Sequence, residues 1–277
     1  MTNPLEENLH QPVMDVLGPE NGEHWRARTR PAFALTSQES DGTVVGQLFG
    51  LPSLPADVPW PVREGHGPMT HLATIDCAEL PQGVLDFDMP ENGTLLFFRW
   101  STADGERYFT AEGKQWGRDD EIYFMEGRGT DPGAGVKLLY VPAHADTAPR
   151  PHPDGDKCTD AQPLRLVGTF ASRLMWELTE NEYPVADDYR LADAFDEWES
   201  PFDVQIGGHQ APVQGPSVDK AAGGDLRGPY GAQADEGTMI MLATFYDYND
   251  DVKASWFIEP RHLAQHRFDE IYYDYQC

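Results

Sequence analysis

The chain has 277 residues, of which 40% are hydrophobic and 11% aromatic, values typical of a globular protein. Its formal charge is -27, from 47 acidic and 20 basic residues. A surface this negative repels phosphate backbones and anionic lipid headgroups, so the composition argues against nucleic-acid and membrane binding. The charge favours a basic protein partner, and the plainer alternative is that it serves solubility.

The N-terminal residues and the cysteines indicate the cellular compartment. Residues 1–8 contain no basic region followed by an apolar one, and no run approaches about 18 apolar residues, so we expect a cytoplasmic protein. Cys77, Cys158 and Cys277 are widely spaced and odd in number, which indicates reduced thiols and no structural zinc. We expect no cofactor, and the oligomeric state stays open.

Prolines and apolar runs organise the first part of the chain. Residues 5–17 place apolar side chains at helical spacing and predict one or two helical turns on the outside. Pro31 to Leu35 predicts an edge strand, because proline donates no ladder hydrogen bond. Four prolines between Gly50 and Pro61 exclude a helix interior and predict an extended chain. Two apolar runs, 69–76 and 94–100, then predict buried strands.

The remainder alternates short apolar runs with polar or glycine-rich connections. Further strands are predicted at 107–110, 120–125, 135–142, 164–176, 239–246, 254–258 and 271–275, and helices at 187–198 and 260–266. Residues 143–162 are rich in Pro, Asp and His and predict an exposed loop and a subdomain boundary. Residues 215–237 predict a second flexible connection.

A series of short motifs opens and closes the chain. Between Gly50 and Phe98 they read Gly-x-Pro-x-x-Pro, Trp-Pro, Leu-Ala-x-Ile-Asp, Glu-Leu-Pro and Gly-x-Leu-x-Phe-Phe. The end has an aromatic strand, Pro-x-x-Leu, Arg-Phe-Asp and a last aromatic strand. This order resembles the YwqG-like family, a bacterial family of unknown function. Many relatives have Gln where Thr74 and Thr244 stand, and a Trp-Gly-Asp-x-Gly turn where this chain has Asn249–Lys253. The resemblance therefore implies an architecture but no substrate.

An internal repeat is suggested by three pairs of segments. Leu72–Thr74 recurs as Leu242–Thr244, Gly50–Pro55 has a loose counterpart in Gly207–Pro212, and Leu95–Phe98 corresponds to Ser255–Ile258. Chance similarity of such short strings is the alternative. We predict an α+β fold that is predominantly β, a duplicated unit of short antiparallel strands with a few peripheral helices. Residues 1–44 would be an N-terminal helical or extended segment, and 45–277 the YwqG-like domain, with repeats at 45–142 and 163–277 sharing one core.

The candidate binding residues are His71, His209, Gln210 and Gln214. The last three lie in the string Gly207–Gln214, where relatives carry Gly-x-Pro-x-x-x-Gln, and a glycine-rich turn presents side chains well to a ligand. The competing interpretation is that Gln214 satisfies buried backbone groups and that His71 is a hydrogen-bonded core histidine.

Two motifs suggest metals but are incomplete. His262 and His266 have the i, i+4 spacing of a zinc-binding helix, yet the sequence lacks the adjacent Glu that would act as base, so a solvated helix face is favoured. Asp247–Asp251 begins like a calcium loop, but Val252 and Ile258 occupy the positions of the required Gly and Glu. An acidic turn between two strands explains it, and we predict no metal site.

The sequence favours binding over catalysis. It has no Gly-x-Ser-x-Gly elbow and no activated cysteine pattern, so nucleophilic catalysis is unsupported. We expect a non-enzymatic protein-binding module with an acidic surface. The resemblance implies a sharper version, an immunity or antitoxin-like protein. The alternative is a small-molecule sensor or enzyme with a pocket between the repeats, lined by His71, His209 and Gln214.

Overall fold

The protein is mostly β, as predicted, with short helical elements. The computed structural model describes residues 14–15, 17–23, 27, 29–100, 126–128, 135–155, 160–172, 202–210, 239–247 and 252–276. Within this part of the chain, no helix combines the length and the apolar character needed to cross a bilayer.

The elements have the following bounds. The strands are β1 (Arg30–Thr36), β2 (Thr43–Leu48), β3 (Ser53–Pro55), β4 (Val62–Arg63), β5 (Gly67–Pro68), β6 (Thr70–Asp76), β7 (Thr94–Arg99), β8 (Glu126–Arg128), β9 (Val136–Val141), β10 (Thr147–Pro149), β11 (Gln162–Ser172), β12 (Val204–Gly207), β13 (Ile240–Asp247), β14 (Val252–Ile258) and β15 (Tyr272–Gln276). The labelled helical elements are the 3-10 turns η1 (Cys77–Glu79) and η3 (Phe268–Glu270) and the helix α6 (Pro260–Ala264). Residues 17–23 are also helical.

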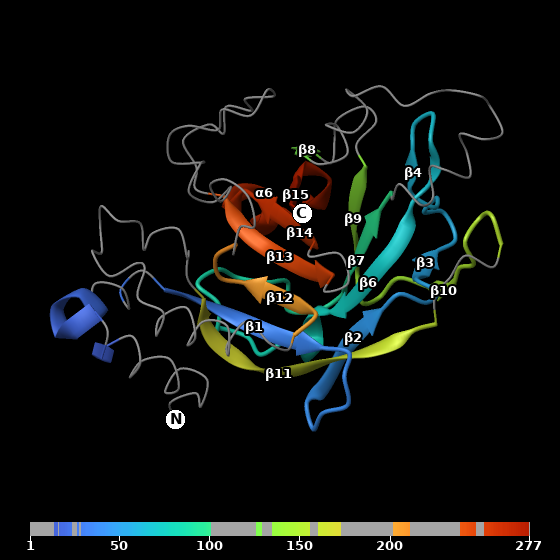
Figure 1. Ribbon diagram of the computed structural model, residues 1–277. Helices are drawn as coiled ribbons and strands as arrows, with labels where there is room; N and C mark the ends of the chain where they lie inside the picture. The colour runs from blue at the N-terminus through green and yellow to red at the C-terminus, as the bar shows by residue number, and fades with distance from the viewer. Residues whose placement is uncertain are drawn as a thin grey trace.

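One 11-stranded antiparallel sheet dominates the fold. Its strand order is β8-β15-β14-β13-β12-β1-β11-β2-β6-β7-β9, and two two-stranded ribbons, β3 with β10 and β4 with β5, lie outside it. The long pair β1 and β11 forms the centre (Figure 1). We call β2, β6, β7 and β9 the first wing, and β12, β13, β14 and β15 the second wing. β1 pairs with the second wing through β12, and β11 pairs with the first wing through β2.

The sheet curls until its wings pack against each other (Figure 1). Phe97 of β7 and Trp256 of β14 are fully buried and meet edge to face, with ring centroids 5.4 Å apart. Phe245 of β13 contacts both rings. Near the sheet edges, Tyr140 of β9 lies 5.4 Å from the ring of Phe268 in η3. The main core therefore fills the space enclosed by one curled sheet.

Alternation of side chains along the strands explains this core. In β6, Ala73 and Ile75 are buried in the main core and Thr74 between them is not, the period expected when one face of a strand points inward. The pairing of β6 with β7 shifts register between His71 and Ala73, and that of β13 with β14 shifts between Met241 and Ala243. Such bulges increase strand twist, which a curled sheet requires.

The predicted strand positions are confirmed where the structure describes them, with one correction. Residues 31–35 were expected at a sheet edge, but β1 is central and its residues 32–36 are all buried. The structure accommodates Pro31 because β12 begins to pair only at Ala32, so the proline lies beyond the end of that neighbour. Strands β2, β3, β4, β5, β8, β10 and β12 were not predicted, and β10 lies in the segment 143–162 that was expected to be a loop. The segments 107–110, 120–125, 187–198 and 215–237 lie outside the described residues.

Truncating the ring pair across the wings should destabilise the protein strongly. We expect Phe97→Ala and Trp256→Ala each to cost about 3–5 kcal/mol in the free energy of unfolding, measured by denaturant titration. The double variant should lose about 0.5–1.5 kcal/mol less than the sum, since it removes one shared contact. Val62→Ala, at a side chain that is 57% exposed, is the control and should stay within about 0.5 kcal/mol. Strict additivity of the ring variants would contradict the packing described.

Candidate functional site

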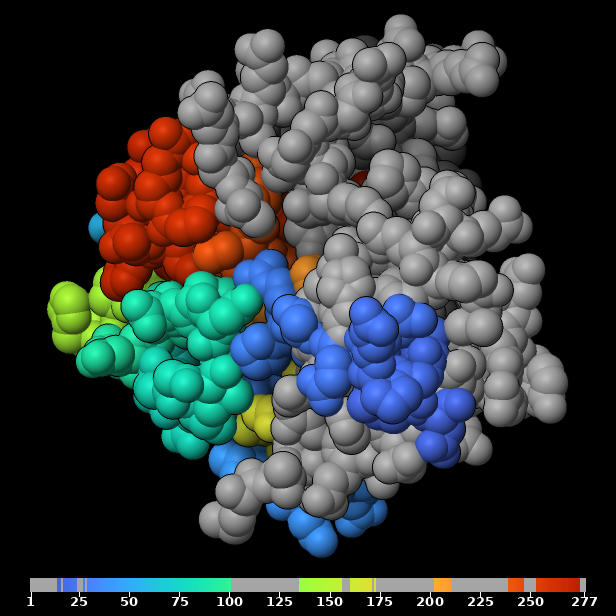
Figure 2. All heavy atoms as spheres, turned by 90° about the vertical axis from the view of Figure 1, so that its left-hand side faces the viewer, coloured from blue at the N-terminus to red at the C-terminus, as the bar shows by residue number. Residues whose placement is uncertain are grey.

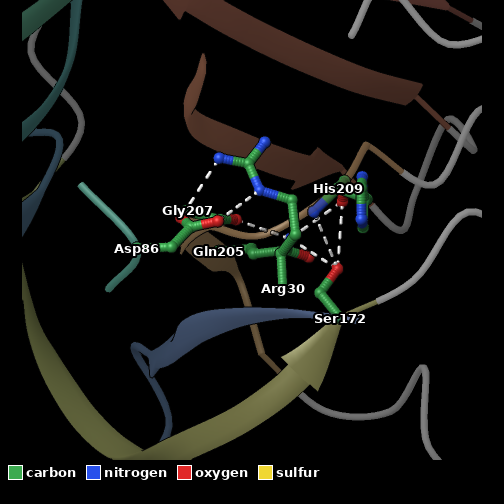
Figure 3. Close-up of polar contacts among 6 residues, drawn as sticks. All are labelled: Arg30, Asp86, Ser172, Gln205, Gly207 and His209. Carbon is green, nitrogen blue, oxygen red and sulfur yellow. Dashed lines mark hydrogen bonds and ion pairs between the residues drawn. The ribbon is translucent and has the colours of Figure 1, made fainter. Parts of the chain in front are cut away.

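The loop that follows β12 is fixed from two sides (Figure 3). Gln205 donates from its amide nitrogen to the carbonyl oxygens of Gly207, at 2.8 Å, and His209, at 3.0 Å. The Ser172 hydroxyl accepts from the His209 backbone N–H at 3.0 Å and lies 3.1 Å from the His209 carbonyl oxygen, to which it donates. The backbone of this loop is therefore held by side chains of two different strands.

Glycine is required at the turn of this loop. Gly207 and Gly208 both have positive φ, 74° and 77°, a conformation that costs other residues free energy. A Cβ at Gly208 would lie 2.5 Å from Cβ of Ser172 and 2.9 Å from Cβ of Ala32. The predicted glycine-rich turn is thus confirmed, and its close packing determines where Gln210 lies.

A straight row of buried polar side chains crosses the second wing. Gln205, Thr244, Ser255 and Asp274 are register partners on β12, β13, β14 and β15, and each is at most 5% exposed. Their sequence neighbours belong to the main core, so alternation places these four on the face that points away from it. We call these four residues the polar row.

Gln210 joins the polar row from the loop. Its amide nitrogen donates to the Ser255 hydroxyl at 3.2 Å and to the Asp274 carboxylate at 2.5 Å. The Thr244 and Ser255 hydroxyls are 2.9 Å apart and share a hydrogen bond. Gln210 itself is fully buried. The result is a continuous hydrogen-bonded chain from Thr244 to the carboxylate.

The first wing has the same row with different chemistry. Gln47, Thr74, Leu96 and Leu139 are register partners on β2, β6, β7 and β9. Leu96 packs in a separate apolar cluster, and Leu139 lies against it. The members of that cluster from outside the wing include Leu54 and Trp60, from the proline-rich segment Gly50–Pro61, and Met69, which directly precedes β6. The face that is polar in the second wing is therefore apolar at two of four positions in the first.

His71 lies in the first wing and not beside His209. Its ring is buried, with Nδ1 3.2 Å from the Gly50 carbonyl oxygen and Nε2 2.9 Å from the Thr74 hydroxyl. Burial lowers the pKa of His71 to about 4. Three strands, β1, β11 and β2, separate β6 from β12, so the two histidines belong to different wings. Of the other predicted site residues, Gln210 adjoins His209 and Gln214 lies outside the described residues.

His262 and His266 have the spacing of a zinc-binding helix, but in the structure they do not lie on one face of a helix. Helix α6 ends at Ala264, and His266 has a φ of 52° beyond its end. The His266 ring is 4.7 Å from that of Tyr140, so it packs against β9. Among the described residues, no group of three or more His, Cys, Asp or Glu has the geometry to hold a metal ion.

An ion pair ties the acidic loop after β6 to the central strand (Figure 3). Arg30 at the start of β1 contacts Asp86 through two nitrogens, Nε to Oδ2 at 2.7 Å and Nη2 to Oδ1 at 3.1 Å. A bidentate pair of this kind fixes orientation as well as position. It anchors the segment 77–93 against the sheet near the loop that carries His209.

The chain was compared with known protein families. A family model described as a domain of unknown function, DUF1963, matches residues 46–277. The chain belongs to the DUF1963 family. No curated protein matches it. The match begins within β2, so the central strand β1 of this DUF1963 protein precedes the matched region.

A substitution at Gly208 should disturb the site more than one at an open glycine. Gly155→Ala introduces a side chain at a φ of 85° with nothing within 4 Å, and should cost about 1 kcal/mol. Gly208→Ala adds a clash with Ser172 and should cost at least about 1 kcal/mol more. Denaturant unfolding measures the difference. Equal losses would show that the close approach at Gly208 is unimportant.

The buried His71 should make stability depend on pH. Its folded pKa of about 4 lies below the ordinary value of 6.5, so the unfolded chain binds more protons between these values. Stability should therefore fall as the pH is lowered from 6.5 towards 4, by up to about 3 kcal/mol from this residue. His71→Met, which replaces the ring with an unbranched apolar side chain that does not titrate, should flatten the stability-pH curve in that range. Parallel curves for the two proteins would contradict the assignment.

Proposed function

We propose that this DUF1963 protein is a non-enzymatic binding protein whose partner is a basic protein. The observation that carries this proposal is the segment 77–93, which contains four carboxylates and no Lys or Arg. Glu79, Asp86, Asp88 and Glu91 are all exposed. Its apolar residues Val84, Leu85 and Phe87 pack against the main core, so the carboxylates are presented from an anchored loop.

The acidic segment borders two other parts of the surface. In Figure 2 the teal atoms of this part of the chain lie below the C-terminal residues, red, and to the left of the beginning of the described chain, blue. The Tyr140 hydroxyl donates to the Asn92 carbonyl oxygen, and its ring packs on Phe268, so η3 with Asp269 and Glu270 lies near. An anchored acidic face suits electrostatic steering of a basic partner.

The hydrogen bonds of the polar side chains support binding over catalysis. Ser255 is bonded to a hydroxyl and to an amide nitrogen, and Gln210 stands between it and the Asp274 carboxylate. Neither partner of Ser255 is a general base. Thr74 does contact His71, but a pKa of about 4 makes His71 a weak base at neutral pH.

The proposal also includes membership of the YwqG-like family, a bacterial origin and a cytoplasmic location. The motifs shared with the YwqG-like family support a bacterial, cytoplasmic protein of that type. An immunity or antitoxin-like role is the sharper form, because a small acidic protein that captures a basic toxin needs no catalytic group. A second candidate, small-molecule binding, is favoured by the polar row.

We also infer that the domain is a duplicated unit. Gln47 donates to the carbonyl oxygens two and four residues ahead, as Gln205 does. Phe49 and Gly50 have positive φ, like Gly207 and Gly208. The bulges at Leu72 and Leu242 also match. The shared register aligns Leu96 with Ser255, one residue away from the alignment expected above. A superposition of β2, β6 and β7 on β12, β13 and β14 that separated Gln47 from Gln205 would contradict the duplication.

Affinity purification with charge variants tests the basic partner. The tagged protein should retain a stoichiometric basic protein from native extract at low salt and release it at high salt, since exposed charge pairs are screened. The triple variant Glu79→Gln, Asp88→Asn, Glu91→Gln should lose that partner. Asp86 is left intact because of its ion pair with Arg30.

The matched control removes three carboxylates elsewhere. Glu39, Asp41 and Glu64 are exposed outside the acidic segment, and their neutralisation should leave capture nearly unchanged. Equal loss in both variants would indicate an effect of net charge alone. Recovery of no stoichiometric partner at low salt would reject the proposal.

A further inference from the structure

The two central strands of the sheet are exchanged between the two halves of the chain (Figure 1). We call residues 29–155 the first half and residues 160–276 the second half. Strand β1 belongs to the first half, yet both of its neighbours in the sheet, β11 and β12, belong to the second. Conversely, β11 lies between β1 and β2 of the first half. Each half therefore receives a strand from the other.

The second half holds β1 along both of its edges. Register partners run from Arg30 to Thr36 along β11 and from Ala32 to Leu35 along β12, and both ladders are antiparallel. Residues 32–36 are all buried. In complexes where a peptide adds to a sheet, main-chain hydrogen bonds along one edge supply affinity. Here the strand has a ladder on each side, so the second half surrounds it as a receptor surrounds a peptide.

The side chains of β1 alternate between two environments. Phe33 and Leu35 lie in the main core, whereas Ala32 and Ala34 lie in a separate apolar cluster with Phe170 of β11. All four β1 side chains are at most 2% exposed. One face of the strand therefore requires large apolar residues, and the other requires small ones. Alternate side chains of this kind give strand-addition sites their specificity.

Asp203, the residue before β12, fixes the end of β1. Its carboxylate accepts hydrogen bonds from the Thr36 hydroxyl at 3.2 Å and from the Ser37 backbone N–H at 2.5 Å. Its backbone N–H donates to the Leu35 carbonyl oxygen at 2.8 Å. These bonds hold the strand in one register, which matters because a slip by one residue would turn its large side chains out of the core.

We propose that the second half contains a binding site for an extended peptide strand, which β1 occupies as an intramolecular ligand. We call this site, the position between β11 and β12, the strand slot. Its ligand is an apolar strand with large side chains on the face of Phe33 and small ones on the face of Ala34. The slot lies at the centre of the sheet and not in the acidic segment 77–93, so this inference is independent of the basic-partner proposal.

The covalent connection to β2 serves to concentrate β1 at the slot. Residues 37–42 join β1 to β2 across the single intervening strand β11. A short tether raises the effective concentration of a ligand without adding any contact. Strand β1 should therefore remain bound when this tether is cut.

Cutting the connection tests the strand slot. A protease recognition sequence is inserted after Glu39, which is exposed, and the folded full-length protein is then cut. Residues 1–39 contain no cysteine, so no disulfide can hold them to the remainder. We expect the fragment 1–39 to co-elute with residues 40–277 in size-exclusion chromatography. Separate elution would overturn the proposal.

A synthetic peptide localises the binding to β1. The cut protein is unfolded in urea and refolded with an excess of a fluorescent peptide of residues 29–38. We expect this peptide to replace the fragment 1–39 and to co-elute with residues 40–277. Uncut protein refolded in the same way should retain little peptide, because its own β1 is tethered at the slot.

Two variant peptides test the specificity of the slot, and neither requires a variant protein to fold. Phe33→Ala removes a large side chain from the core and should weaken competition with the wild-type peptide at least about tenfold. Gln38→Ala, at an exposed residue beyond β1, is the matched control and should change it less than twofold. Equal competition by the two variants would overturn the proposal, as would no uptake of peptide by cut protein under conditions in which uncut protein refolds.

A further measurement covers a failure of the protein to refold. The same two substitutions are introduced into the chain that carries the protease site, and the native cut proteins are chromatographed in rising concentrations of urea. The fragment 1–39 should dissociate at a lower urea concentration with Phe33→Ala than with Gln38→Ala, because only Phe33 fills the slot. Dissociation of both at the same urea concentration would count against a specific slot and overturn the proposal.

Discussion

The contact between Phe97 and Trp256 is the constraint on which the fold depends. Seven strand-to-strand steps separate β7 from β14 in the sheet, yet the two rings touch. The sheet must therefore curl through its central pair, β1 and β11. This curling gives the molecule one enclosed core and turns the opposite face of each wing outwards. Register shifts in four strand pairs, two of them involving β1 and β11 themselves, add twist that makes such a curl possible for antiparallel strands.

Once the inner faces are used for the core, only the outer faces are free to differ. The outer face of the first wing is apolar and packs with Leu54, Trp60 and Met69. The need to cover this apolar face explains the many prolines before Met69. A segment that is already rigid and extended loses little conformational entropy when it packs across a sheet. The outer face of the second wing carries Ser255 and Asp274 instead, so the outer faces of the two wings differ in chemistry although both wings are four-stranded and antiparallel.

Alternation and proline positions made most strands predictable, because both act within a few residues. Strand β1 was misplaced, since Pro31 signals an edge and the sequence does not reveal that the antiparallel strand β12 ends opposite Ala32. Gln210 was singled out from the glycines beside it, whereas Thr244, Ser255 and Asp274 were not. Each of these three looks like an ordinary polar residue within a strand. They form a row only through register across four strands, and register is a property of the folded sheet.

That register also determines which residues carry information about function. A buried hydrogen-bonded residue alone says little, because folded proteins satisfy buried polar groups whatever their role. His71 is such a case: its two ring contacts account for it fully. The register position of Asp274 on β15 can be set beside that of Leu139 on β9, since each lies four strands along its wing. The antiparallel ladder itself therefore accepts either a charged or an apolar side chain, and what packs on the outer face decides between them.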